Sequence, residues 1–144
     1  MQETDLEILK ADFQFSTPIQ LRFSDIDGYL HVNNGVYFNY FEHARAVYLY
    51  EHCHWDIMKV GTVVGRIEID YLRPIHLTDQ VEALVRCSKI GNTSFHLEQI
   101  LWGKTKKGQS LVFAKCTCIL VSVDMNTMKP VPVPEEYREK LAAS

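Results

Sequence analysis

Two aspartates, a histidine and two asparagines are concentrated within ten residues, in the stretch DIDGYLHVNN at positions 25–34. Carboxylates such as those of Asp25 and Asp27 can act as a base toward water or as nucleophiles toward a carbonyl carbon. His31 can donate a hydrogen bond or position a carbonyl group. These residue types are compatible with acyl-transfer chemistry, but Asp and Asn are also ordinary turn and cap residues. Asp25, at the end of an expected strand, is the better candidate for a purely structural role.

A long helix is predicted directly after this stretch, over residues 34–53. Apolar side chains recur there at spacings of three and four residues, which is typical of a helix with one buried face. These side chains are Val36, Tyr37, Tyr40, Phe41, Ala44, Val47 and Tyr48. Asn33 or Asn34 is a plausible N-cap. The free N–H groups and partial positive field of the first helical turn favour anions, including an oxyanion formed during acyl transfer.

The rest of the chain shows the period-two alternation of β-strands. The predicted strands are residues 18–24 before the polar stretch, then 63–73, 80–90, 93–102 and 109–123, and a short helix follows Pro134. The connections between the later strands are too short for parallel crossovers, so the sheet should be antiparallel. Residues 109–123 are apolar on both faces, which predicts an interior strand. The pattern indicates an α+β fold in which a sheet curls around the one long helix.

Composition narrows the class of protein. The 144 residues favour a single domain, 1–144, and a net charge of −3 with a pI near 6.0 argues against a nucleic-acid partner. No apolar run approaches the roughly 20 residues of a membrane span. The N-terminus lacks a signal-peptide pattern, so we expect a cytoplasmic protein whose four cysteines are reduced. No metal site is predicted, because His52, Cys53 and His54 are adjacent and do not share a helix face.

One longer stretch resembles a known family. RFSDIDGYLHVNNGVYFNYFEHAR, residues 22–45, is similar to the signature of hotdog-fold acyl-CoA thioesterases of the 4-hydroxybenzoyl-CoA thioesterase type. That signature reads R-[FY]-x-D-x-D-x-x-G-H-V-N-N and continues into an aromatic helix that ends in E-x-A-R. The likeness extends to IDYLRPIHLTDQV and IGNTSFHLEQILW, and so covers nearly all of the chain. It implies a hotdog fold and hydrolysis of an acyl- or aryl-CoA to free acid and CoA.

The resemblance also implies roles for individual residues. Asp27 matches the catalytic carboxylate of the family, as general base or nucleophile, and His31 matches the catalytic histidine. Asn33 and Asn34 match the asparagine pair of the signature, which we expect to contribute to the oxyanion site or to position the loop.

Leu30 departs from the signature, which has glycine directly before the histidine. The backbone N–H near this position is the expected oxyanion donor in the family. Leucine resists a positive φ, so we expect Gly28, two residues earlier, to absorb the strain.

Candidate substrate-binding residues follow from the same likeness, each with a simpler alternative. Thr93 and Ser94 match a segment near the pantetheine arm, or they simply begin a polar strand. Arg73 could meet a CoA phosphate or form a surface ion pair, and Tyr37 could line an acyl pocket or pack in the core. Tyr71 is expected to face the site from a neighbouring chain.

The family likeness implies no metal or redox cofactor, because CoA enters as part of the substrate. Open sheet edges predict a homodimer or homotetramer with each site at a subunit boundary. Two alternatives stay open: a thioesterase for acyl-carrier protein, and a non-catalytic acyl-CoA-binding module. The acyl group itself is not predicted.

Overall fold

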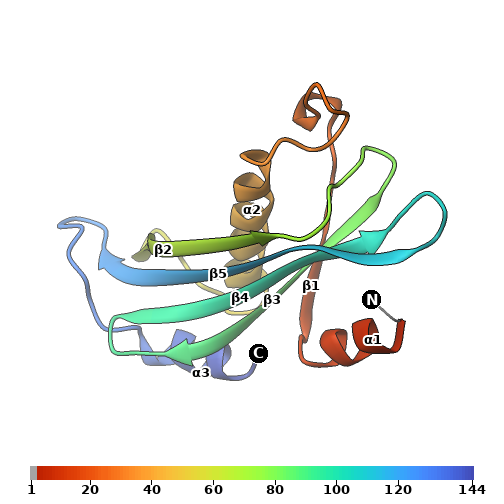
Figure 1. Ribbon diagram of the computed structural model, residues 1–144. Helices are drawn as coiled ribbons and strands as arrows, with labels where there is room; N and C mark the ends of the chain where they lie inside the picture. Colours follow the sequence, from red (N-terminus) through yellow and green to blue (C-terminus); the bar gives the residue numbers. More distant parts are fainter. Residues whose placement is uncertain (1–2) are drawn as a thin grey trace.

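The computed structural model describes residues 3–144, in which one helix lies across a face of a five-stranded antiparallel sheet (Figure 1). The elements in chain order are α1 (Glu3–Ala11), β1 (Phe15–Ile19), the 3₁₀ turn η1 (Phe23–Asp25), α2 (Val36–Glu51), β2 (Val60–Tyr71), β3 (Gln80–Ile90), β4 (Ser94–Lys104), β5 (Ser110–Asp124) and α3 (Glu135–Ala142). The order of strands in the sheet is β1-β3-β4-β5-β2, and every pairing is antiparallel. The predicted α+β class is confirmed.

The later strands follow the predicted alternation closely. β3 coincides with the predicted range, and β4 and β5 each begin one residue later than expected. β5 lies between β4 and β2, as its two apolar faces predicted. Along β2, Ile67 and Ile69 are half-buried against the core while Arg66 and Glu68 are exposed.

The first strand was misplaced in the prediction, which put it at residues 18–24. The strand is Phe15–Ile19, whose side chains alternate between buried and exposed. The following RFSD segment turns instead of extending, because the carboxylate of Asp25 reaches back to the backbone of Arg22. The Arg22 N–H donates to Asp25 Oδ2 at 3.1 Å. This local capping bond closes the 3₁₀ turn η1 and ends the extended backbone.

The central helix begins and ends two residues inside the predicted range 34–53. Its N-cap is Gly35, which corrects the expectation of Asn33 or Asn34. The side-chain oxygen of Asn33 accepts the Gly35 N–H at 2.9 Å and holds the preceding residues in a turn. One side of α2 packs on the sheet, and its fully buried members include Phe41, Ala44 and Tyr48. All the side chains predicted for the buried face of α2 are buried or half-buried, whereas Phe38 and Tyr50, outside that face, are 45% and 75% exposed.

A second, smaller core covers the opposite face of the sheet and was not predicted. Ala83 and Val85 of β3 belong to the main core, whereas Leu84 between them belongs to the second cluster. That cluster consists of Leu6, Phe13, Leu84, Ile100, Trp102 and Val112. Helix α1 therefore covers part of the face turned away from α2.

The strand β2 ends the sheet on one side. Within residues 3–144 it pairs with β5 alone, so its outer edge is free. None of the helices described for this part of the chain is long and apolar enough to cross a membrane.

Candidate functional site

The loop between η1 and α2 folds back on itself as a small hairpin. Ile26 and Val32 form an antiparallel bridge, and the Asp27 N–H donates to the His31 carbonyl at 2.8 Å. The Leu30 N–H donates to the Asp27 carbonyl at 3.0 Å. The hairpin stands at the N-terminal end of α2, on the side of the molecule away from α1 and α3 (Figure 1). It brings together Asp27, Leu30 and His31 of the predicted site.

Leu30 itself takes the strained position in this turn. Its φ is +66°, whereas Gly28 is not left-handed, so the expectation that Gly28 absorbs the strain was wrong. A left-handed residue that follows a tight turn and closes a hairpin is the place where glycine is strongly preferred. A leucine there costs about 1–2 kcal/mol. Because its N–H is already donated to the Asp27 carbonyl, Leu30 offers no free N–H to an oxyanion.

The two aspartates of the loop differ sharply in their surroundings. Asp25 is 2% exposed, and its carboxylate accepts hydrogen bonds from the Tyr40 hydroxyl at 2.6 Å and from Arg22 through its backbone N–H and its guanidinium, each at 3.1 Å. Burial alone would raise the pKa of Asp25, but these bonds and the Arg22 charge hold the pKa below its ordinary value. Burial and the bond to Asp25 raise the pKa of Tyr40. Asp25 is thus an anchor between the loop and α2.

Asp27 is only half-buried, and its carboxylate accepts fewer hydrogen bonds than that of Asp25. Its Oδ1 accepts the Tyr29 N–H at 2.9 Å, and among the described residues no hydrogen bond to Oδ2 occurs. The Oδ1 contact fixes the rotamer of the carboxylate, and the second oxygen stays available to water or a ligand. Asp27 is thus the aspartate of this loop that keeps a carboxylate oxygen free, and its catalytic role stays a prediction.

His31 is accompanied by a histidine that the sequence reasoning missed. The backbones of His31 and His76 form an antiparallel bridge, and their rings meet edge to face with centroids 4.8 Å apart. The His76 N–H donates to Asp79 Oδ2 at 2.8 Å, and the Asp79 N–H donates to the His76 carbonyl at 2.9 Å. The H-x-x-D spacing in PIHLTDQ is the sequence signal of this capped turn.

A pair of tyrosines connects the start of α2 to the end of β2. The Tyr71 hydroxyl donates to the Asn34 carbonyl at 2.9 Å, and the Tyr37 and Tyr71 rings are 5.0 Å apart. Tyr37 is 2% exposed and accepts the Ile75 N–H at 3.3 Å. Burial raises the pKa of Tyr37. Within one chain Tyr37 packs in the core, while Tyr71 remains 43% exposed beside Asn34.

Thr93 and Ser94 lie at the other end of α2. The Thr93 carbonyl accepts the Ser122 N–H at 2.8 Å, and Ser94 precedes Phe95, which contacts Trp55 just beyond the C-terminal end of the helix. A helix of 16 residues is about 24 Å long. A single chain therefore does not bring Thr93 or Ser94 to Asp27.

Arg73 is exposed, and its backbone N–H donates to the Phe113 carbonyl at 3.0 Å. Its side chain forms no ion pair with any carboxylate in the described range. The surface ion pair considered as the simpler alternative is thus not found.

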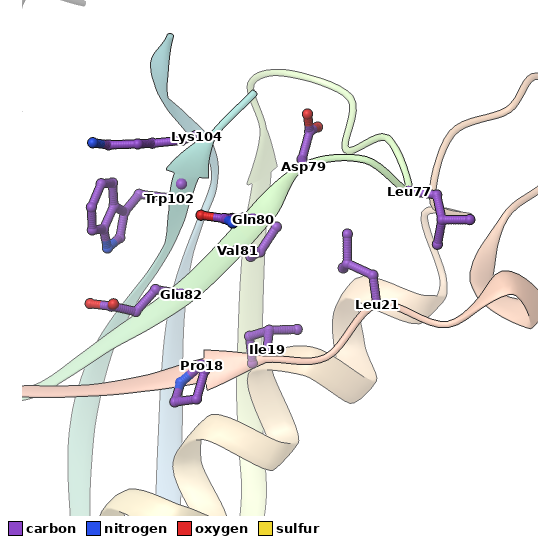
Figure 2. A pocket seen from close by; sticks show the side chains of 11 residues that line it. Pro18, Ile19, Leu21, Leu77, Asp79, Gln80, Val81, Glu82, Trp102 and Lys104 are labelled. Atoms are coloured by element: carbon purple, nitrogen blue, oxygen red, sulfur yellow. The ribbon is translucent and has the colours of Figure 1, made fainter. Parts of the chain in front are cut away.

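A cleft of about 640 Å³ opens where β1 ends, between the chain after Ile19 and the neighbouring ends of β3 and β4 (Figure 2). It is lined by Pro18, Ile19, Leu21, Leu77, Asp79, Gln80, Val81, Glu82, Trp102, Gly103 and Lys104. Asp79, which caps the His76 turn, also lines this cleft. None of the residues predicted for the site lines the cleft. No group of three or more His, Cys, Asp or Glu side chains within residues 3–144 is arranged to hold a metal ion.

Comparisons with known proteins bear on this geometry. A family model described as the thioesterase-like superfamily matches residues 21–141. The long-chain acyl-CoA thioesterase FadM of Escherichia coli (strain K12) is 30% identical over 128 residues, which cover 87% of this chain and 95% of FadM.

Solved structures agree with the same fold. A thioesterase from Thermus thermophilus, complexed with coenzyme A and Zn, is 36% identical with a TM-score of 0.75, covering 91% of this chain and 94% of that chain. A 4-hydroxybenzoyl-CoA thioesterase mutant complexed with 4-hydroxybenzoyl-CoA has a TM-score of 0.80 at 14% identity, covering 88% and 97% of the two chains. The latter likeness bears on the fold alone, and it confirms the predicted hotdog arrangement.

Proposed function

Because the chain belongs to the thioesterase-like superfamily, we propose that it is an acyl-CoA thioesterase in which Asp27 supplies the reacting carboxylate. The names of FadM and of the Thermus thermophilus structure support CoA as the carrier of the acyl group. The observation that carries the assignment of Asp27 is the contrast between the two aspartates. Asp25 is buried and saturated with hydrogen bonds, whereas Asp27 keeps a carboxylate oxygen free.

In the proposed reaction, Asp27 acts on the thioester carbonyl in one of two ways. As a base, it takes a proton from water while the water oxygen bonds to the carbonyl carbon, and the C–S bond then breaks to release CoA. As a nucleophile, its free oxygen attacks the carbon directly, CoA leaves as the thiolate, and water hydrolyses the resulting anhydride. The products are the free acid and CoA in both cases.

The start of α2 is the proposed oxyanion site. The first turn of the helix contains no acidic residue. The Gly35 and Val36 N–H groups already donate to Asn33. The next N–H groups of the first turn have no partners within the helix, so we propose that these donate to the negative oxygen of the tetrahedral intermediate. His31 lies on the same loop and is proposed to orient the carbonyl group.

A second copy of the chain is proposed to complete the site. The long outer edge of β2 is free within the described chain, and a free edge of this length is normally paired or covered. Edge-to-edge pairing would supply Thr93 and Ser94 from a second copy, since each chain holds its own pair at the far end of α2. We therefore expect a dimer or larger assembly, in which Arg73 remains a candidate for a CoA phosphate.

No metal or redox cofactor takes part in the proposed reaction. CoA enters only as part of the substrate, and the cytoplasm is the expected compartment. Acyl-carrier protein remains an alternative carrier of the acyl group.

The decisive experiment compares Asp27→Asn with Asp25→Asn, using free-thiol release from a panel of acetyl-, hexanoyl-, decanoyl- and benzoyl-CoA. Loss of a positioned base costs on the order of 10²–10⁴ in rate. Asp27→Asn should lose turnover to this extent and still bind decanoyl-CoA. Asp25→Asn should be less stable but retain more activity. Turnover near the wild-type rate in Asp27→Asn would refute the assignment, and a larger loss in Asp25→Asn would move it to the other aspartate.

A further inference from the structure

Leu30 is a strained residue in a position that glycine fills without strain. The signature that the loop resembles has glycine here, yet this chain has a leucine at φ +66°. Within residues 3–144, two other non-glycine residues are left-handed, His54 just after α2 and Met128 in the turn after β5. Only Leu30 lies in the turn that contains Asp27.

The fold makes almost no use of the Leu30 side chain. Leu30 is 74% exposed, so the side chain adds little to the core and does not offset the strain of its backbone. Strained backbone that the fold does not require is found chiefly at functional sites. We therefore expect the Leu30 side chain to contact another molecule.

We propose that the Leu30 side chain contacts the acyl group of the substrate and selects for apolar acyl chains. This inference rests on the proposed thioesterase function. The turn fixes Leu30 relative to the reacting carboxylate, because the Leu30 N–H donates to the carbonyl of Asp27 at 3.0 Å. Tyr29, between Gly28 and Leu30, is also exposed (82%), so the rim of the turn is apolar beside a carboxylate.

The acyl group is the part of an acyl-CoA that fits this place. A reacting carbonyl carbon must come within about 3–3.5 Å of the attacking oxygen, so the thioester and the first carbons of the acyl chain lie next to Asp27. The pantetheine arm is rich in amides and the nucleotide is charged, whereas the acyl chain is apolar. A leucine that covers it removes apolar surface from water and keeps bulk water from the thioester.

The test exchanges the leucine for residues that separate its backbone from its side chain. Leu30→Gly removes both the strain and the side chain, and Leu30→Ala removes most of the side chain but keeps a Cβ at the strained position. Met128→Gly is the matched control, because Met128 is left-handed (φ +58°) and exposed but lies outside the turn that contains Asp27. Thiol release from acetyl-, decanoyl- and benzoyl-CoA gives kcat/KM, and thermal melting gives stability.

Leu30→Gly should melt at or above the wild-type temperature and still lose about tenfold in kcat/KM for decanoyl- and benzoyl-CoA, a typical discrimination from one apolar contact. Acetyl-CoA should lose much less, and Met128→Gly should keep full activity. Leu30→Ala should show the same loss of activity without a gain in stability.

Wild-type kcat/KM for all three esters in Leu30→Gly would overturn the proposal. So would dissociation of the Leu30→Gly assembly in sedimentation together with an equal loss on acetyl-CoA, because Leu30 would then be a subunit contact.

A second experiment separates this inference from the proposed function. Calorimetry measures the affinity for decanoyl-CoA in the single variant Asp27→Asn and in the double variant Asp27→Asn with Leu30→Gly. If Asp27→Asn turns over at the wild-type rate, only the proposed role of Asp27 is refuted. If adding Leu30→Gly leaves the affinity for decanoyl-CoA unchanged, only the proposed contact of Leu30 is refuted.

Discussion

Replacing Gln99 by leucine should destabilise the protein severely, because the Gln99 side chain accepts a hydrogen bond from the buried guanidinium of Arg45. Arg45 on α2 is 7% exposed and Gln99 on β4 is 1% exposed. The Arg45 guanidinium donates to Gln99 Oε1 at 3.4 Å, and Gln99 Nε2 donates to the Phe41 carbonyl at 2.9 Å. Arg45 forms no ion pair with a carboxylate of the described chain. The amide of Gln99 therefore joins the middle of α2 to the middle of the sheet.

The expected cost follows from these contacts. Gln99→Leu leaves the guanidinium without its acceptor and removes the hydrogen bond to the Phe41 carbonyl. A hydrogen bond to a charged group contributes about 1.5–3 kcal/mol, and a buried polar group left without a partner costs about 1–3 kcal/mol, so we expect a loss of about 3 kcal/mol. For a chain of this length the melting temperature should fall by about 6–12 °C.

Urea unfolding followed by circular dichroism measures the change in the free energy of unfolding. The control is the double variant Arg45→Met with Gln99→Leu, which removes the charge together with its partner. Replacing a buried polar pair by apolar side chains of similar volume is often close to neutral, so the double variant should be more stable than Gln99→Leu. The reasoning is refuted if Gln99→Leu costs less than about 1 kcal/mol, the net worth of an ordinary hydrogen bond, or if the double variant is the less stable of the two.

Two further predictions concern the loop. The pKa of Asp25 is lower in the folded chain than its ordinary 3.8, so the unfolded chain binds more protons and the stabilisation from Asp25 is lost as the pH falls below about 3.8. Asp25→Asn should flatten the decline of the urea midpoint between about pH 4 and pH 2, and an equally steep decline would contradict this. His76→Ala should lower kcat about tenfold with little change in KM, because the ring that orients His31 is lost. His76→Phe keeps an edge-to-face ring, so a loss as large as that of His76→Ala would exclude orientation by ring contact.

The sheet was the most predictable part of the fold, because its signal is local. Alternation alone gave the bounds of β3, and the apolar faces of β5 predicted its interior position. Helix α1 was missed for the opposite reason. Its partners Leu84, Ile100 and Trp102 lie more than seventy residues along the chain, and nothing within Glu3–Ala11 reveals them.

The site was predictable in its residue types but not in its contacts. The DIDGYLHVNN spacing correctly placed Asp27, Leu30 and His31 in one turn, and the terminal position of Asp25 correctly suggested a structural carboxylate. The strain was assigned to Gly28 because glycine adopts a positive φ most easily. The hydrogen bond from the Leu30 N–H to the Asp27 carbonyl closes the turn at Leu30, so the left-handed residue is Leu30 and not Gly28. His76 was missed because its partner His31 lies forty-five positions earlier in the chain.

Helix α1 makes the outer face of the sheet unequal in its two halves. One half is closed, with the Lys10 ammonium 4.2 Å from the centroid of the Trp102 ring. The other half is more polar, and the Arg66–Glu68 ion pair, His96, Thr117 and Ile119 line a depression of about 170 Å³ there. Association through the edge of β2 would rest on backbone hydrogen bonds. If two dimers formed in this way stacked through the sheet face turned away from α2, they would meet at the half that contains Arg66 and Glu68. Their association should therefore weaken as salt is added.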